Sequence, residues 1–362
     1  MLRIFIITIC LLTGCMKDAF EPNNFLKDAK QVELGSPFKL SIYPEKDIDY
    51  FKLNVPLPGY LEFSAGIEKP ANMKLEVKVY NQGGEIIKSK TGMPIRFSIG
   101  AGDVIFSINA VDSKIYSKEL FPMTVSFKDV NLDSYEPNNE ISEAKAIEAG
   151  STAAINIFPI GDMDFFKVVL YDTGFLNVGY DFNKPANFNL CASVFDENGR
   201  LLIQDSDLPA KFPLRKGIYV FGIRDIYNNE SSDIIFNLSF DMQPVALDRS
   251  EPNDSIDTAK KVNFNSSSKI NIFPIGDSDY FKVHTSFPGT IKLEAGNDVP
   301  QQLNLVGRIF DQEGRVLAGF ARLPVSLSVE KNRDYFVSIS DELDDAASEK
   351  NFSIYIKVVQ QK

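Results

Sequence analysis

Apolar and polar side chains alternate along most of this chain of 362 residues. In the run KLEVKVY at residues 74–80, Leu75, Val77 and Val79 would share one face of a strand, with mostly polar residues on the other. Seven or eight such strands within ~110 residues, separated by Gly, Pro, Asn and Asp turns, predict an all-β fold of the antiparallel β-sandwich or jelly-roll type. The other runs in the first third of the chain are residues 38–43, 50–55, 60–65, 95–100, 104–111 and 123–130.

One phrase recurs three times at a spacing of 115 residues. INIFPIGDSDYFKV at 270–283 shares twelve of its fourteen letters with INIFPIGDMDFFKV at 155–168, and LSIYPEKDIDYFKL occupies 40–53. The tetrapeptide EPNN or EPND keeps the same spacing. A repeat this long is a whole domain, since solenoid elements run to about 20–50 residues. The sequence therefore predicts three tandem sandwich domains, called units 1, 2 and 3 below, at residues 21–135, 136–250 and 251–362.

A short helical turn is predicted directly after each EPN(N/D), in FLKDAKQV, EISEAKAI and SIDTAKKV. Asn and Asp are favoured at helix N-termini because their side chains accept hydrogen bonds from the first free N–H groups. The residues expected to cap these turns are Asn24, Asn139 and Asp254.

The N-terminus has the pattern of a targeting segment. A short MLR stretch precedes the apolar run IFIITICLL at 4–12, which is too short to span a bilayer. The following LTGC resembles the lipobox of bacterial lipoproteins. This resemblance implies a signal peptide at 1–14, a diacylglyceryl group on Cys15 and a short tether at 15–20. The alternative is an ordinary signal peptide that happens to contain a cysteine.

Cysteine usage excludes an internal disulfide in the mature chain. Of the three cysteines, Cys10 would leave with the signal peptide and Cys15 would carry lipid, so that Cys191 remains as a lone thiol. Its neighbours Asn189 and Ser193 give it no positive surroundings, and we expect an ordinary strand residue.

The order of EPN(N/D), D-x-D-[YF]-F-K and a β-rich remainder resembles the bacterial pre-peptidase C-terminal (PPC) domain. The resemblance covers nearly all of residues 21–362, as three tandem copies. It implies β-sandwich modules that often follow secreted proteases, and some members, such as those of clostridial collagenases, bind collagen and calcium.

Calcium is the metal that these motifs would hold, because it takes 6–8 oxygen ligands from carboxylates and amides. The sequence favours unit 3, where EPND and Asp-x-Asp offer Glu251, Asn253, Asp254, Asp277 and Asp279. The matching residues are Glu136, Asn138, Asn139, Asp162 and Asp164 in unit 2, and Glu21, Asn23, Asn24, Asp47 and Asp49 in unit 1. In calcium-binding relatives two further acids contribute. Here those positions hold Ala19, Ser134 and Arg249, and then Lys46, Gly161 and Gly276.

The preferred interpretation is structural and needs no cofactor. Asn side chains of the EPN turn would bond nearby backbone. The second carboxylate of each pair, such as Asp164 or Asp279, would accept backbone N–H bonds from that turn and fasten the start of the domain to a strand. Calcium remains the alternative, with unit 3 as its best candidate.

Charge and composition exclude several classes of function. A formal net charge of −11 without a basic stripe argues against a nucleic-acid partner. The chain has one histidine, His284, which is too few for a two-histidine zinc site, and nothing near it in sequence suggests a catalytic triad. We therefore expect no enzyme.

The predicted function is a non-enzymatic envelope protein that the Cys15 lipid holds at the membrane and whose modules bind a protein or extracellular-matrix ligand. The alternative is an accessory subunit that supports a separate envelope enzyme such as a peptidase. Cys15 is followed by Met16 and Lys17, and neither is the aspartate that signals inner-membrane retention. We expect the outer membrane, on its periplasmic or its surface face.

Overall fold

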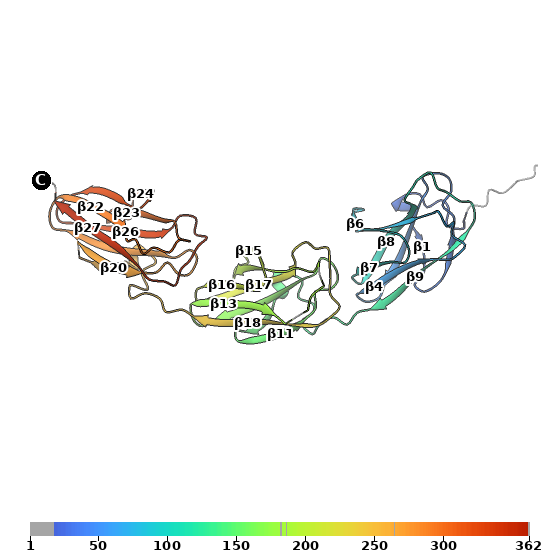
Figure 1. Cartoon of the computed structure of the whole chain (residues 1–362), viewed down its shortest axis with the longest axis horizontal. Helices are drawn as coiled ribbons and strands as arrows, with labels where there is room; N and C mark the ends of the chain where they lie inside the picture. The colour runs from blue at the N-terminus through green and yellow to red at the C-terminus, as the bar shows by residue number, and fades with distance from the viewer. Residues whose placement is uncertain (1–17, 182, 186, 264, 361–362) are drawn as a thin grey trace, which may run out of the picture.

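The computed structural model describes residues 18–181, 183–185, 187–263 and 265–360, and the predicted signal peptide and Cys15 lie outside these ranges. Figure 1 shows three β-sandwiches in a row, with unit 2 between the other two. Within the described ranges no helix is long and apolar enough to cross a membrane.

Unit 1 consists of a five-stranded and a four-stranded sheet packed face to face. The first has the order β1-β3-β8-β5-β6 and the second β2-β9-β4-β7. A 3₁₀ turn, η1 (Leu26–Asp28), precedes β1. The strands are β1 Lys30–Gln31, β2 Phe38–Leu40, β3 Ile48–Val55, β4 Gly59–Ala65, β5 Leu75–Tyr80, β6 Ile86–Thr91, β7 Ile95–Ile99, β8 Gly102–Ala110 and β9 Phe121–Asp129.

Units 2 and 3 repeat this topology strand for strand, with sheet orders β10-β12-β17-β14-β15 and β11-β18-β13-β16, then β19-β21-β26-β23-β24 and β20-β27-β22-β25. Unit 2 contains η2 Ile141–Glu143, β10 Lys145–Glu148, β11 Ser151–Ile155, β12 Met163–Leu170, β13 Gly174–Tyr180, β14 Leu190–Asp196, β15 Leu201–Asp207, β16 Ala210–Leu214, β17 Gly217–Asp225 and β18 Phe236–Pro244. Unit 3 contains η3 Ile256–Thr258, β19 Lys260–Val262, β20 Ser266–Ile270, β21 Ser278–Thr285, β22 Gly289–Ala295, β23 Leu305–Phe310, β24 Val316–Arg322, β25 Val325–Val329, β26 Arg333–Asp341 and β27 Phe352–Gln360.

Each sandwich encloses its own hydrophobic core, because alternate residues of both sheets point inward. In unit 1 the rings of Phe51 and Phe106 stack with centroids 5.5 Å apart, and Phe63 from the other sheet packs edge-on against Phe106 at 5.0 Å. The predicted all-β sandwich fold is confirmed.

Three details differ from the prediction. The short edge strands β1, β10 and β19 pair parallel with β3, β12 and β21, although an antiparallel fold was expected. The strands predicted in unit 1 do not include β6. The residues of β6, β15 and β24 are largely exposed on both faces, so that these strands lack the alternation of buried and exposed residues. The predicted 3₁₀ turns exist, but their N-cap residues are Phe25, Glu140 and Ser255.

Candidate functional site

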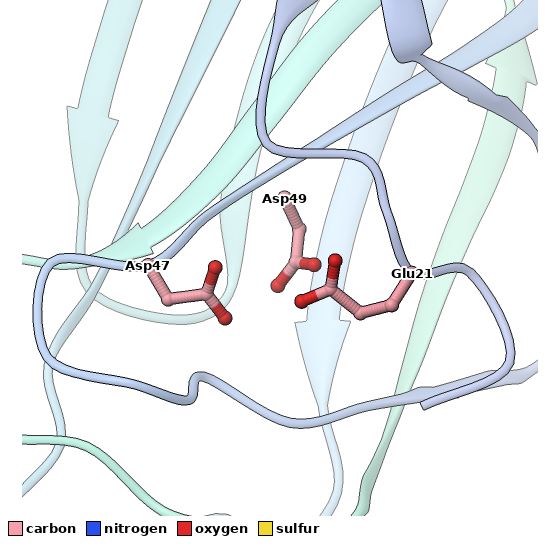
Figure 2. Close-up of side chains that lie close together, drawn as sticks. All are labelled: Glu21, Asp47 and Asp49. Atoms are coloured by element: carbon pink, nitrogen blue, oxygen red, sulfur yellow. The ribbon is translucent and has the colours of Figure 1, made fainter. Parts of the chain in front are cut away.

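The two motifs of each unit meet at one end of the sandwich. In unit 1, Glu21 precedes η1, Asp47 ends the loop before β3, and Asp49 is the second residue of β3. Figure 2 shows the three carboxylates pointing toward one another. One oxygen from each lies within 4.8 Å of the others, and the same holds for Glu136, Asp162 and Asp164 in unit 2 and for Glu251, Asp254 and Asp277 in unit 3.

A backbone bond holds the two motifs together. The N–H of Tyr50, which follows Asp49, donates to the carbonyl of Asn23 at 2.9 Å, and the equivalent bonds in units 2 and 3 measure 2.9 and 2.8 Å. The EPN turn is thus fastened to the strand, as the structural interpretation proposed, but the bond is made by main-chain atoms.

The first carboxylate of each pair accepts a main-chain bond within its own loop. Phe158 N–H donates to Asp162 Oδ2 at 2.8 Å, and Tyr43 and Phe273 do the same for Asp47 and Asp277. These carboxylates are nearly inaccessible, with exposed fractions between 1% and 5%. One oxygen of each is therefore committed to the loop.

The second carboxylate has no such donors, which corrects the expectation for Asp164 and Asp279. Asp49 and Asp164 are fully buried, and neither oxygen of either residue has a hydrogen-bond partner in the described structure. In unit 3 the amide of Asn253 donates to Asp279 Oδ1 at 2.8 Å, and the other oxygen is unpartnered. Buried carboxylates without donors are costly and are normally paired or bound to a metal.

The amides beside these carboxylates are also unsatisfied. Asn23 and Asn138 are fully buried, and neither their Oδ1 nor their Nδ2 atoms have partners. The outer Asn24 and Asn139 do not cap the 3₁₀ turns but donate to Glu21 and Glu136 at 3.1 and 3.0 Å. In units 1 and 2, buried carboxylate and amide oxygens of the two motifs are therefore left without hydrogen-bond partners among the described residues.

Crowding of carboxylates disfavours their charged forms. Burial raises the pKa of Asp49 to about 9, with further contributions from the charges of Asp47 and Asp18, while the nearby Asn23 amide lowers it without forming a hydrogen bond of normal geometry. Burial likewise raises the pKa of Asp162 to about 7, and it raises the pKa of Asp164 well above its ordinary value. Without a counter-charge, these groups are stable only when they hold protons.

Unit 3 differs because an arginine of unit 2 enters its cluster. Arg215 Nη2 lies 2.6 Å from Asp254 Oδ1 and 2.8 Å from Asp277 Oδ1. The sequence favoured this unit for calcium partly because EPND ends in Asp, and that Asp is the one that faces Arg215.

Sequence reasoning missed a fourth acidic residue. Asp18, Asp133 and Asp248 lie three residues before each EPN(N/D), one position earlier than the acid sought there, and all three are buried. Asp133 accepts the N–H groups of Asn156 at 3.0 Å and Tyr135 at 2.8 Å. These three residues, called the leading aspartates below, fasten the start of each unit, which is the role predicted for the second carboxylate. Their spacing of 115 residues was a signal that could have found them.

The other expected ligand position has a left-handed backbone in all three units, and unit 1 places Lys46 there with a φ of +67°. Gly161 and Gly276 have φ angles of +90° and +79° in the tight turn before the first carboxylate. A left-handed conformation there favours glycine over a residue with a side chain.

A hard divalent cation fits the clusters of units 1 and 2. Calcium–oxygen distances of about 2.3–2.6 Å allow ligand oxygens to lie up to roughly 5 Å apart, and the oxygens of these carboxylates lie within 4.8 Å of one another. In unit 2, Glu136, Asp162, Asp164 and Asn138 Oδ1 would hold the ion, whose charge would stabilise the deprotonated carboxylates.

The histidine and the described cysteine lie outside the acidic clusters. His284 Nδ1 lies 2.8 Å from Asp334 on an exposed strand surface. Cys191 is 1% exposed, and burial raises the pKa of its thiol to about 12. It is therefore a buried strand residue and a poor nucleophile.

Comparison with known proteins gives similarity to solved structures alone. No family model and no curated protein matches the chain. The pre-peptidase C-terminal domain of a collagenase from Bacillus anthracis matches 28% of this chain and 93% of that chain, with 10% identity and a TM-score of 0.21. The CUB1-EGF-CUB2 domains of rat MASP-1 match 91% of this chain and 100% of that chain, with 10% identity and a TM-score of 0.31. Similarities of this size carry no argument about function.

Proposed function

We propose that this chain is a non-catalytic binding protein whose three sandwiches offer edge strands to a protein ligand and whose units 1 and 2 each hold a divalent cation. The observation that carries the binding role is a repeated apolar pair at the start of each outer edge strand. The exposed fractions are 54% and 49% for Ile86 and Ile87, 45% and 39% for Leu201 and Leu202, and 46% and 45% for Val316 and Leu317.

These pairs lie on strands that have a hydrogen-bonded neighbour on one side only. β6, β15 and β24 each end the order of a five-stranded sheet. An edge strand presents unpaired N–H and C=O groups, and apolar side chains beside them would add contact area for an extended segment of a partner. A protein ligand that contributes such a segment is the partner these edges suit.

The surroundings of the described histidine and cysteine are compatible with the non-catalytic part of the proposal. The histidine is exposed and bound to an aspartate, and the described cysteine is buried. The acidic clusters bring carboxylate oxygens within 4.8 Å of one another. Oxygen-rich sites of this kind bind calcium as a structural ion.

The membrane tether is part of the proposal and rests on the LTGC sequence. Lipid on Cys15 would hold the chain in the cell envelope, at the outer membrane, by burial of its acyl chains. The Cys15→Ser variant should leave the membrane fraction and should no longer incorporate a fatty-acid analogue. Unchanged labelling of this variant would refute the tether.

The proposed role of the edge strands in ligand binding can be tested by capturing ligands from envelope extracts. The bait is the Cys15→Ser chain, and its edge variant carries Ile86→Lys, Leu201→Lys and Val316→Lys. The matched control carries Val111→Lys, Tyr227→Lys and Leu343→Lys, which change exposed apolar residues of the loops after β8, β17 and β26.

A ligand captured by the wild type and the control, but lost from the edge variant, is the expected result. Equal capture by both variants, or loss from the loop control alone, would contradict the edge-strand proposal. A captured envelope peptidase would favour the accessory role over a matrix-binding role.

A further inference from the structure

The boundary between units 2 and 3 contains an arginine that reaches into a carboxylate cluster. Arg215 directly follows β16 of unit 2, and its Nη2 contacts both Asp254 and Asp277 of unit 3. Asp277 is fully buried at its side chain, and its Oδ2 already accepts the Phe273 N–H. Arg215 therefore takes the one oxygen of Asp277 that the loop leaves free.

The boundary between units 1 and 2 has the same architecture but a different residue at this position. Gly100 directly follows β7, the strand that corresponds to β16, and stands 115 residues before Arg215. A cavity of about 440 Å³ lies beside it and is lined from both units, by Pro58 and Gly100 on one side and by Glu136, Asn139 and Asp162 among others on the other. The unit 2 cluster thus opens into this cavity.

Units 2 and 3 differ at the fourth residue of the EPN(N/D) motif as well as in the residue, Gly100 or Arg215, that the preceding unit places beside it. Unit 3 has Asp254, which pairs with Arg215, whereas unit 2 has Asn139, which donates to its own Glu136. A guanidinium is permanently charged and can serve two carboxylates at once. A calcium ion bound to Asp277 Oδ1 would lie within a few ångströms of that guanidinium, and the two positive charges would repel each other.

We propose that Arg215 is a built-in cation, which takes the position of the metal in unit 3 and fastens unit 3 to unit 2 without any ion. The chain then binds two divalent cations, in units 1 and 2, and none in unit 3. The count of ions rests on the function proposed above, but the fastening of units 2 and 3 by Arg215 does not.

The test removes the arginine from unit 2 and, in a separate variant, introduces one at the equivalent position of unit 1. Arg215→Ala should open the unit 3 cluster and raise the calcium stoichiometry from two to three ions per chain, as measured by equilibrium dialysis and calorimetry. Gly100→Arg should lower it to one. The glycine can accept a side chain, because a Cβ there would meet only Pro159 Cγ, at 4.0 Å. Lys216→Ala and Gly100→Ala are the matched controls and should leave two ions bound.

A second measurement judges the fastening by itself. The segment between β18 and Glu251 contains the exposed Arg249, which trypsin can cleave. In calcium-free buffer, Arg215→Ala should increase the rate of this cleavage at least several-fold, and Lys216→Ala should not.

The outcomes separate the two claims. Three ions in the wild type, or two in Arg215→Ala, would overturn the metal-replacing role of Arg215. No calcium in any variant would refute the cation sites of the proposed function, and the cleavage rates would then decide the fastening. Equal cleavage of wild type and Arg215→Ala would overturn that part.

Discussion

The ring of Tyr60 packs edge-on against the ring of Phe158, with centroids 5.0 Å apart and planes at 71°. Tyr60 belongs to β4 of unit 1, and Phe158 lies in the loop before β12 of unit 2. The same contact recurs 115 residues later between Phe175 and Phe273, at 4.9 Å. The sandwiches are therefore joined by a repeated aromatic contact as well as by their linkers.

Tyr60→Ala should loosen the joint between units 1 and 2, because an aromatic pair contributes about 0.5–1.5 kcal/mol beyond its buried area. Small-angle X-ray scattering of the full chain should show a broader distribution of interatomic distances. Thr290→Ala is the control, since Thr290 holds the same place in unit 3 and has no aromatic ring. Identical scattering of the wild type and Tyr60→Ala would show that the contact does not restrain the joint.

The leading aspartates are expected to hold the start of each unit in place. Asp248 accepts the N–H groups of Asn271 at 3.1 Å and Ser250 at 2.6 Å, and it is buried. In the full chain, Asp248→Ala should destabilise unit 3 by ~1–3 kcal/mol for each buried donor left without an acceptor.

Differential scanning calorimetry of the full chain should therefore show one thermal transition that moves to a lower temperature. Asp257→Ala, an exposed change in the 3₁₀ turn of the same unit, is the control. If both variants unfold alike, the leading aspartate is not what holds the start of the unit.

The sequence was sufficient to predict the sandwich strands where one face is buried. In β3, alternate residues such as Phe51 and Leu53 are inaccessible, and this alternation is visible in the letters. β6 has no buried face, so Ile86 and Ile87 followed by KSKT carried no usable period. Edge strands are determined by pairing with a neighbour, which a single sequence does not display.

The site was predictable in its members but not in its bonds. Carboxylates of the two motifs lie close together in each unit, and in unit 3 the close group contains Glu251, Asp254 and Asp277. Which oxygen accepts which N–H depends on loop geometry, and the prediction gave the second carboxylate a role that the leading aspartate performs. The contact of Arg215 could not be predicted from the repeat, because the equivalent residues in units 1 and 3 are Gly100 and Glu330. Only the packing of unit 3 against unit 2 brings Arg215 to Asp277.

Stability of the cation-free chain should fall as pH rises. The folded-state pKa of Asp162 is raised to about 7 and that of Asp49 to about 9, above the ordinary value of 3.8. The folded state therefore binds more protons than the unfolded state between these values, and its stability is lost as pH passes from about 4 through about 7 and 9. The loss should reach a few kcal/mol, since each pKa unit corresponds to about 1.4 kcal/mol.

The measurement is thermal unfolding at pH 5, 7 and 9, after passage over a chelating resin. Calcium should flatten this dependence, because the ion holds the carboxylates in their charged form and gains affinity as protons leave. A cation-free melting temperature that rises from pH 5 to pH 9 would show that these carboxylates are not destabilised by burial.

The last prediction concerns the carboxylate that has no partner. Asp164→Asn keeps the shape of the side chain and removes a buried carboxyl group whose oxygens have no hydrogen-bond partner among the described residues. In chelator at neutral pH this variant should be as stable as the wild type or more stable, because it avoids the cost of either protonating the buried carboxyl group or leaving its charge uncompensated. The structural interpretation of the motif, in which this residue fastens the domain, predicts a loss of stability.

Calcium should separate these alternatives further. An ion that binds only the folded state stabilises it by ~2.7 kcal/mol at a hundred times its Kd, and unit 2 should gain this in the wild type. Asp164→Asn should lose the gain in unit 2 and keep it in unit 1, where Asp49 is intact. Asp172→Asn, an exposed change in the turn after β12, should behave like the wild type. A calcium response that survives in unit 2 of Asp164→Asn would mean that the second carboxylate is not a ligand.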